Sequence, residues 1–430
     1  MTTASFPPGF LWGASTSAHQ VEGNNVGSDF WQAENDGSWG LADRSGDACD
    51  SFHRWPEDLD LVRDLGLNAY RFSIEWARVV PAPGRPSPAT LAHYRRIIEG
   101  CGERGLTPVV TLHHFTNPAW LTAEGGWTSK DAIAHFTEYV RAVLPVLDGV
   151  PWVCTINEPN MVAFMAASRK RGGGAPAAYL GPPDAEVTAA LTRAHAAARD
   201  LLAAVPGLRS GWTVANQNVQ DHGAGPDRTA EISYLIDDQY LDVAKGDDFV
   251  GVQAYSRLRA GERGPLLPGP DDRRTMTGWE YYPQALEDAV RHTDARLGGS
   301  TPLLVTENGI ATGDDGERVA YTREAVAGLR RAMADGIDVR GYLHWSLLDN
   351  YEWGSWEPTF GLVAVDRTTF RRTVKPSARW FGRLARDPEA TLATEAEVDP
   401  EATVDPEAKV DPEATVDAGT ALDPDAGAGA

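Results

Sequence analysis

Eight short apolar runs, each with the length of a buried strand, alternate with longer amphipathic segments along this chain. The amphipathic segments, such as Ser87–Gly105 and Asp131–Leu147, carry Leu, Ile, Val and Phe at helical spacing. Eight strand–helix units in sequence predict an α/β fold, a single (β/α)8 TIM barrel. The predicted strands are Phe10–Ser15, Asn68–Ile74, Thr107–His113, Trp152–Asn157, Gly211–Ala215, Phe249–Tyr255, Leu303–Thr306 and Tyr342–Ser346.

An open, doubly wound sheet is the alternative fold for a chain that alternates strands and helices. Such folds carry a Gly-rich phosphate-binding turn after an early strand, and this sequence has none there. The Gly-rich stretch Arg169–Pro176 follows no predicted strand, and no Lys-Ser or Lys-Thr pair closes it. The sequence therefore favours the barrel.

The C-terminal segment differs in composition from the rest of the chain. The hexapeptides VDPEAT, VDPEAK and VDPEAT begin at Val398, Val404 and Val410, in a stretch rich in Pro, Ala and acidic residues. A segment with so little apolar surface cannot offset the entropy lost on ordering. We therefore predict a barrel domain over residues 1–386 and a disordered acidic tail over residues 387–430.

Net charge and cysteine usage restrict the partners of the protein. The chain has 39 basic and 61 acidic residues, a net charge of −22, which argues against nucleic acid or an anionic membrane as a partner. The three cysteines are far apart and form no CxxC pair, which indicates reduced thiols and no metal site. The first residues show neither a basic n-region nor an apolar run long enough for export, so we expect no export signal, and no apolar run approaches the roughly 20 residues of a membrane span. We expect a cytoplasmic protein.

Polar or aromatic residues end almost every predicted strand. In a barrel, the C-terminal ends of all strands meet at one mouth. Glu158 follows the fourth predicted strand in TINEPN, and Glu307 follows the seventh in VTENG. The two carboxylates are therefore expected at the same rim. Asn308 and Gly309 are expected to form the turn that leads the chain off the strand.

Two carboxylates across a cleft are the groups that cleavage of a glycosidic bond requires. One protonates the leaving oxygen and the other meets the cationic sugar carbon, so their pKa values must differ. Arg71, at the end of the second strand, and the Tyr255 hydroxyl are expected to keep Glu307 ionised. Either glutamate alone is more often a cap or a surface residue, but their pairing at strand ends favours catalysis.

The chain resembles glycoside hydrolase family 1, the β-glucosidase and β-galactosidase family of retaining enzymes. The resemblance covers essentially the whole barrel and rests on motifs in the family's order: SAHQVEG, YRFSIEWARV, TLHHFTNPAWL, TINEPN, VTENG and GYLHWSLLDNYEWG. It implies that Glu307 is the nucleophile and Glu158 the acid/base, with retained configuration at the sugar. A retaining mechanism requires carboxyl groups about 5–5.5 Å apart and no metal or organic cofactor.

The resemblance also implies a pocket for one hexose, formed by Gln20, His114, Asn157, Trp345, Glu352 and Trp353. Gln20 and Glu352 would hold the distal hydroxyls with help from His114 and Trp353, Asn157 would hold the 2-hydroxyl, and Trp345 would lie beneath the ring. Outside these motifs, a glutamine or histidine of this kind is more often structural and a tryptophan more often core. Trp279 is a candidate platform for the leaving group.

The sequence departs from the family pattern at three places. Phe115 replaces a tryptophan that often follows the pocket histidine, and this removes an N–H donor. Gln253 stands where the family commonly has asparagine, followed by Ala254 in place of an aromatic residue. The loop after Glu158 differs from the usual sequence, so the sequence does not specify the leaving group. Oligomeric state is also left open.

These features predict a retaining, exo-acting β-glycosidase, β-glucosidase-like, for unphosphorylated β-D-glucosides, galactosides or fucosides, whether small molecules or oligosaccharides. Glu352 disfavours sugars phosphorylated at the 6-position, because its charge would repel the phosphate. A transglycosidase, glycosyltransferase-like in outcome, is an alternative because it shares the chemistry up to the covalent intermediate. A non-catalytic sugar-binding protein is a further alternative, against which the presence of both glutamates argues.

Overall fold

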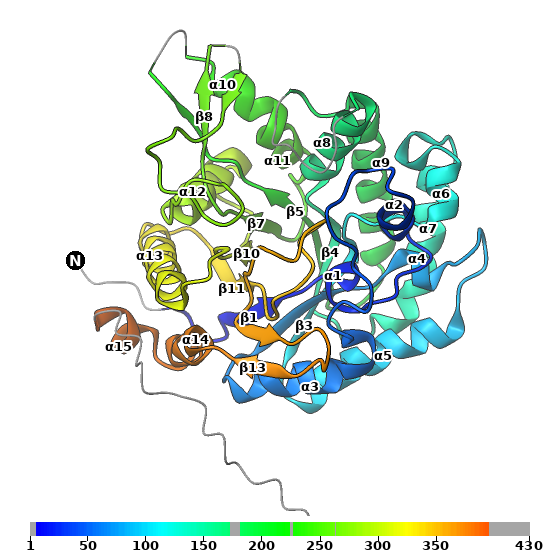
Figure 1. Cartoon of the computed structure of the whole chain (residues 1–430), viewed down its shortest axis with the longest axis horizontal. Helices are drawn as coiled ribbons and strands as arrows, with labels where there is room; N and C mark the ends of the chain where they lie inside the picture. Colours follow the sequence, from blue (N-terminus) through cyan, green and yellow to red (C-terminus); the bar gives the residue numbers. More distant parts are fainter. Residues whose placement is uncertain (1–5, 173–180, 224–226, 263, 395–430) are drawn as a thin grey trace, which may run out of the picture. The chain divides into compact units, whose positions relative to one another are not determined.

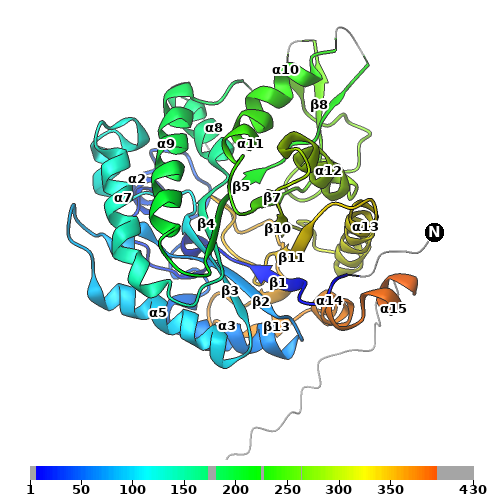
Figure 2. The same ribbon diagram turned by 180° about the vertical axis from the view of Figure 1, so that it is seen from behind.

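The computed structural model describes residues 6–172, 181–223, 227–262 and 264–394. Eight parallel strands close into a barrel in the order β1, β11, β10, β7, β5, β4, β3, β2, with helices around it (Figure 1; Figure 2). This confirms the predicted (β/α)8 fold. The strands are β1 (Leu11–Ser15), β2 (Ala69–Ser73), β3 (Thr107–His113), β4 (Trp152–Asn157), β5 (Arg209–Ala215), β7 (Val250–Gln253), β10 (Leu303–Asn308) and β11 (Val339–Trp345).

Long helices connect successive strands on the outside of the barrel. Side-chain caps fix several of their first residues: Ser87 accepts from the Thr90 amide, and Asp184 and Asp314 each accept from two amides. The helices with more than ten residues are α3 (Ser51–Asp64), α5 (Pro88–Glu103), α7 (Ala132–Val143), α8 (Pro159–Lys170), α9 (Ala185–Leu202), α12 (Ala285–Leu297), α13 (Asp315–Ala334) and α14 (Pro376–Arg386).

Shorter elements complete the described part of the chain. The short helices are α1 (Ala18–Val21), α2 (Asp29–Asp36), α4 (Trp76–Val79), α6 (Ala119–Ala123), α10 (Thr229–Ser233), α11 (Gln239–Val243) and α15 (Pro388–Ala393), with 3-10 turns η1 (Gly126–Thr128) and η2 (Leu144–Val146) and the π-helical turn η3 (Tyr234–Asp238). Two small sheets consist of β6 (Val219–Asp221), β8 (Leu258–Gly261) and β9 (Gly264–Leu266), and of β12 (Val363–Val365) and β13 (Arg372–Val374). Figures 1 and 2 both show β8 beside α10, outside the barrel.

Buried residues on alternate strand positions fill the barrel below its mouth. The inward-facing set forms its own cluster, whereas outward-facing neighbours such as Trp12, Tyr70 and Val110 belong to the cluster that packs the helices on the barrel. The floor of the mouth is therefore apolar. The inward-facing cluster consists of Leu11, Ala69, Val109, Trp152, Cys154, Phe249, Leu304 and Leu343.

The end of β10 differs from the prediction. The strand continues to Asn308, so Glu307 lies within it, and neither Asn308 nor Gly309 has a positive φ. The expected turn at Asn308–Gly309 is therefore wrong. Asn308 instead donates to the Ala254 carbonyl at 2.6 Å, and a Cβ at Gly309 would lie 2.1 Å from the Trp345 carbonyl oxygen. Close approach of two backbones requires glycine here.

Helix α15 extends past the predicted domain boundary at residue 386. Asp387 caps this helix at the Ala390 amide (3.1 Å), Leu392 is buried, and Glu389 pairs with Arg330 at 2.9 Å. The predicted disorder is therefore wrong for residues 387–394. The prediction used the average composition of the segment, whereas a helix cap, an ion pair and one buried leucine stabilise these residues in a helix. The rest of that prediction falls on residues 395–430, which lie outside the described residues.

The sequence predicted reduced cysteines and no membrane-spanning segment. Cys49, Cys101 and Cys154 are all free and buried. Within the described ranges, no helix has the length and hydropathy to cross a membrane.

Candidate active site

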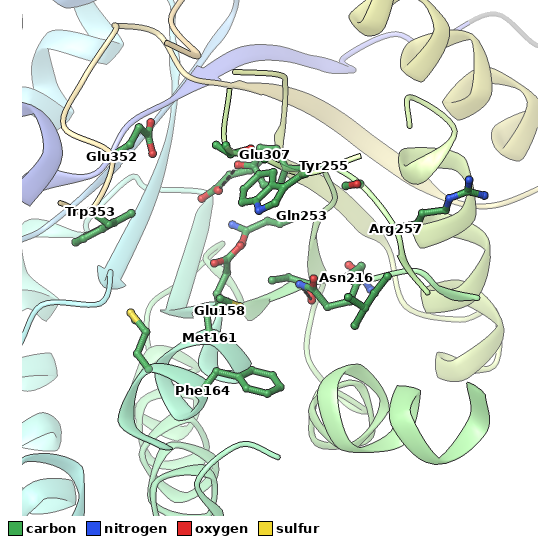
Figure 3. Close-up of a pocket in the computed structure, with 18 of the residues that line it drawn as sticks. Glu158, Met161, Phe164, Asn216, Gln253, Tyr255, Arg257, Glu307, Glu352 and Trp353 are labelled. Carbon is green, nitrogen blue, oxygen red and sulfur yellow. Dashed lines mark hydrogen bonds between the residues drawn. The ribbon is translucent and has the colours of Figure 1, made fainter. Parts of the chain in front are cut away.

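A cavity of about 440 Å³ at the C-terminal ends of the barrel strands brings together most of the predicted site residues (Figure 3). Its volume is in the usual range for small-molecule sites. Nine of the predicted residues line it: His114, Asn157, Glu158, Tyr255, Trp279, Glu307, Trp345, Glu352 and Trp353. Arg71 and Gln20 lie behind this lining and contact it from within the protein.

The backbone at Glu158 holds its side chain at the rim. Glu158 directly follows β4 and has φ 43° and ψ 62°, in the left-handed region, with its amide donating to the Thr213 carbonyl at 2.9 Å. Phe115 (φ 68°) and Trp353 (φ 47°), which also line the cavity, share that region. Each such residue costs on the order of 1–3 kcal/mol, and strain of this kind concentrates at functional sites.

Glu307 lies between a cation and a phenol. Its Oε1 accepts from the Arg71 guanidinium at 2.5 Å, and its Oε2 accepts from the Tyr255 hydroxyl at 2.7 Å. Arg71 is completely buried and also donates to Asn157 (2.5 Å) and Thr111 (3.1 Å). The positive charge of Arg71 therefore lies next to Glu307 in the interior of the barrel.

The environments of the two glutamates differ in electrostatics. Burial raises the pKa of Glu307, but the Arg71 charge and the Tyr255 hydrogen bond oppose that rise. Burial also raises the pKa of Glu158 well above its ordinary value, and the negative charge of Glu307 raises it further. The pKa of Glu158 is thus raised further than that of Glu307, so Glu307 ionises more readily, a difference that acid–nucleophile chemistry requires.

Aromatic and polar groups form the wall on the side of Glu352. The His114 ring stacks between Trp345 (centroids 6.0 Å apart) and Trp353 (5.9 Å), and Trp345 Nε1 donates to Glu352 at 3.3 Å. Burial lowers the pKa of His114 well below its ordinary value, so its ring is neutral. Stacked rings beside a carboxyl match a hexose, which has apolar faces and polar edges.

Asn157 is held in one orientation by three donors. Its Oδ1 accepts from Arg71, from Thr213 (3.0 Å) and from Gln253 (2.9 Å). The sequence marked Gln253 only as a departure from the family pattern, and Thr213 gave no signal. Their role depends on the register of β5 beside β4 and of β7 beside β5, which no local pattern specifies.

Three side chains of the cavity lining each carry one buried polar atom that has no partner among the described residues. Gln253 Oε1, His114 Nδ1 and Asn216 Oδ1 are buried and have no hydrogen-bond partner within the described part of the chain. Buried polar atoms without partners are rare in folded proteins.

Gln20 does not line the cavity. Its Nε2 donates to Asn350 (2.8 Å), to the Tyr351 carbonyl (2.9 Å) and to Glu352 (3.2 Å), and its Oε1 accepts from Ser17. The structure thus places Gln20 behind Glu352, where it holds that carboxyl.

The side of the cavity around Glu158 contains residues that the sequence analysis missed. Helix α8 begins directly after Glu158, so the first part of the segment interpreted as a loop is helical. Met161, Phe164 and Met165 of this helix line the cavity together with Leu258 and Leu266. The helical spacing of the first three was a usable signal, because it places them on one face with Glu158.

A closed parallel barrel with two glutamates in different electrostatic environments at its mouth is typical of one class of enzyme, the glycoside hydrolases that use two carboxyl groups. The model of glycosyl hydrolase family 1 matches residues 2–210 and 248–389 of this sequence. The chain belongs to that family and is a glycoside hydrolase.

Relatives with names and structures are similar over nearly the whole length. The chain is 33% identical to thermostable beta-glucosidase B of Thermobispora bispora, over 89% of this chain and 91% of the relative. It is 31% identical to a bifunctional beta-D-glucosidase/beta-D-fucosidase of Bifidobacterium breve, over 90% and 100%. Among solved structures, a beta-glycosidase from Pyrococcus horikoshii superposes with a TM-score of 0.80 at 34% identity, covering 89% of this chain and 95% of that one.

Proposed function

We propose that this glycoside hydrolase removes single unphosphorylated β-D-hexose residues, with β-glucosides and β-fucosides as the first candidates. The observation that carries the proposal is the pairing of Glu307, bound by Arg71 and Tyr255, with Glu158, whose pKa is raised, in one cavity. The names of the relatives support the choice of sugars.

In the proposed mechanism, Glu307 attacks the anomeric carbon while Glu158 donates its proton to the leaving oxygen. Departure of the leaving group lets Glu158, now ionised, accept a proton from water, which attacks the glycosyl-enzyme and frees Glu307. Asn157, His114 and Glu352 orient the sugar hydroxyls, and Trp345 packs against the ring. Gln20 and Arg71 act as positioning residues through Glu352 and Glu307.

The configuration of the first product tests this mechanism. Two displacements at the same carbon retain configuration, so proton NMR during hydrolysis of an aryl β-glucoside should show β-glucose before any α-glucose. First appearance of α-glucose would contradict a nucleophilic Glu307. Added alcohol in the same experiment measures transfer: alkyl glucoside as the main product would favour the transglycosidase alternative.

Replacing Tyr255 with phenylalanine is expected to shift the acidic limb of the kcat/KM profile to higher pH. The hydroxyl stabilises the ionised form of Glu307, so its loss raises the pKa of Glu307. A hydrogen bond to a charged group contributes about 1.5–3 kcal/mol, which predicts a shift of about one pH unit or more. Tyr282→Phe is the matched control, because that hydroxyl bonds to Asp288 outside the cavity. An unshifted limb in Tyr255→Phe would contradict the assigned role.

Discrimination against a 6-phosphate is expected to increase with pH. Removal of water around Glu352 raises its pKa to about 8, so the charge invoked from the sequence is only partly present at neutral pH. We expect kcat/KM for nitrophenyl β-glucoside to exceed that for its 6-phosphate by about 100-fold or more, because like charges cost several kcal/mol. The ratio should rise as pH rises through 8 and Glu352 ionises. A ratio near one, or one that falls with pH, would argue against this role of Glu352.

A cytoplasmic location remains a proposal, supported by the three free cysteines.

A further inference from the structure

The part of the cavity that would receive the leaving group has a predominantly apolar lining. We infer, on the basis of the proposed function, that this enzyme acts on β-glycosides whose aglycone is an apolar alkyl or aryl group and not a second sugar. The inference depends on three observations: a stripe on α8, two leucines at the end of β9, and the pairing of Arg257 and Arg259 with other side chains.

The stripe on α8 starts at the acid/base residue. Met161, Phe164, Met165 and Ser168 all line the cavity and follow a spacing of three, four and seven residues, which places them on one helix face. Glu158 lies one turn before Met161, so a leaving oxygen protonated by Glu158 directs the rest of its group along this stripe. In the view of Figure 3, Phe164 lies beyond Glu158 on the side away from Glu352. Methionines suit apolar groups of varied shape because their side chains are flexible and polarizable.

The end of β9 contributes exposed apolar surface to the cavity. Leu266 is 37% exposed and Leu267 is 63% exposed, yet both line the cavity. Leu258 packs with Phe164, Ile232 and Ile236 in a buried cluster, which stabilises this side of the cavity. We call the surface formed by Met161, Phe164, Met165, Leu266 and Leu267 the apolar wall. Apolar surface at the edge of a cavity gains free energy when an apolar group covers it.

Two of the three arginines that line this side of the cavity, Arg257 and Arg259, already have partners; the third is Arg171, at the end of α8. Arg257 donates to both oxygens of Glu280 at 3.1 and 2.5 Å and to Gln220 at 2.9 Å. Arg259 donates to Glu280 at 2.8 Å and to Asp272 at 3.1 Å. A second sugar would need donors and acceptors that are not engaged in this way, because its hydroxyls lose water when they enter. The wall therefore favours a group that requires no hydrogen bonds.

A series of n-alkyl β-glucosides, from methyl to octyl, tests this inference because the leaving-group pKa stays nearly constant along it. A fully buried methylene contributes about 0.8 kcal/mol, or about fourfold. We expect kcat/KM to rise about two- to fourfold per methylene until the alkyl group extends beyond the apolar wall. The highest kcat/KM in the series should exceed that for cellobiose. A flat series, or cellobiose as the better substrate, would overturn the inference.

Two variants connect the effect to the wall. Leu267→Asn and Met165→Gln should each lower the ratio of kcat/KM for octyl to that for methyl glucoside by about threefold or more. Val26→Asn is the matched control, since Val26 is 62% exposed and does not line the cavity. An unchanged ratio in both wall variants, or an equal fall in the control, would count against the inference.

Binding separates this inference from the proposed function. Calorimetric Kd values for the same alkyl series on the inactive Glu307→Gln variant do not depend on turnover. If wild type cleaves no glucoside, the proposed function fails, and the Kd series still decides the nature of the aglycone. Kd values that fall with chain length support an apolar aglycone, and constant values contradict it.

Discussion

Replacing Glu307 with glycine is expected to lower kcat for an aryl β-glucoside by about 10⁴-fold or more. The substitution removes the atom that forms the covalent bond, and loss of a nucleophile eliminates most of the chemical acceleration. Arg71 and Tyr255 remain as donors around the vacated space. Circular dichroism should show that the variant is folded, so that the loss is assigned to chemistry.

Azide should restore turnover in this variant. A small anion can enter the space left by the carboxylate and is attracted by the buried Arg71 charge. It attacks from the face opposite the leaving group, so the product is expected to be the α-glycosyl azide. Full activity of Glu307→Gly without azide, or β-glycosyl azide as its product, would refute the assignment of Glu307 as nucleophile.

Replacing Glu158 with glutamine is expected to lower kcat/KM for an alkyl β-glucoside by roughly 10²–10⁴-fold, the usual contribution of general acid–base catalysis. Glutamine keeps the size of the side chain but cannot donate the proton. A dinitrophenyl β-glucoside needs no protonation of its leaving group, so its glycosylation rate should change little. The basic limb of the pH profile, which reports ionisation of Glu158, should disappear. Equal losses for both substrates would assign Glu158 a binding role instead.

The same substitution is expected to stabilise the protein at neutral pH. Burial and the Glu307 charge raise the pKa of Glu158 in the folded state. Between the ordinary glutamate pKa and this raised value, the unfolded chain releases the proton that the folded chain keeps, so wild-type stability falls as pH rises. Glutamine has no proton to release, so Tm of Glu158→Gln should exceed that of wild type at pH 7 and converge with it near pH 4. Glu357→Gln, at an exposed position, should leave Tm unchanged.

Local patterns predicted the architecture well because they depend on neighbours in sequence. The alternation of apolar runs and amphipathic segments located all eight barrel strands, with β1, β2 and β7 shorter and β5, β10 and β11 longer than expected. The failures involve contacts between distant segments. Gly309 does not form a turn; it allows the backbone to lie close to the Trp345 carbonyl. Helix α15 is stabilised by an ion pair between its Glu389 and Arg330 of α13.

Sequence patterns also gave wrong expectations for two parts of the site, where contacts between distant residues decide the structure. The segment Met165–Pro183 was interpreted as an atypical loop, but its residues up to Lys170 belong to α8 (Pro159–Lys170), which supplies part of the apolar wall. Gln20 was expected to touch the sugar, whereas its amide is engaged with Asn350, Tyr351 and Glu352. Motifs identify which residues gather at a site, but not which of them faces the ligand.

The sequence by itself determined the barrel, the two glutamates and the family, because periodicity and motif order are properties of the linear chain. The family resemblance also implied that Glu158 is the acid and Glu307 the nucleophile, but only the tertiary structure shows the contacts and the burial that act on the pKa of each glutamate. Arg71 reaches Glu307 across 236 residues of sequence, and burial at the same mouth raises the pKa of Glu158. Closure of the barrel creates both effects, since electrostatic interactions depend on distance and solvent exclusion in space. The same closure brings α8 and the β8–β9 hairpin to one cavity, where they form the apolar wall.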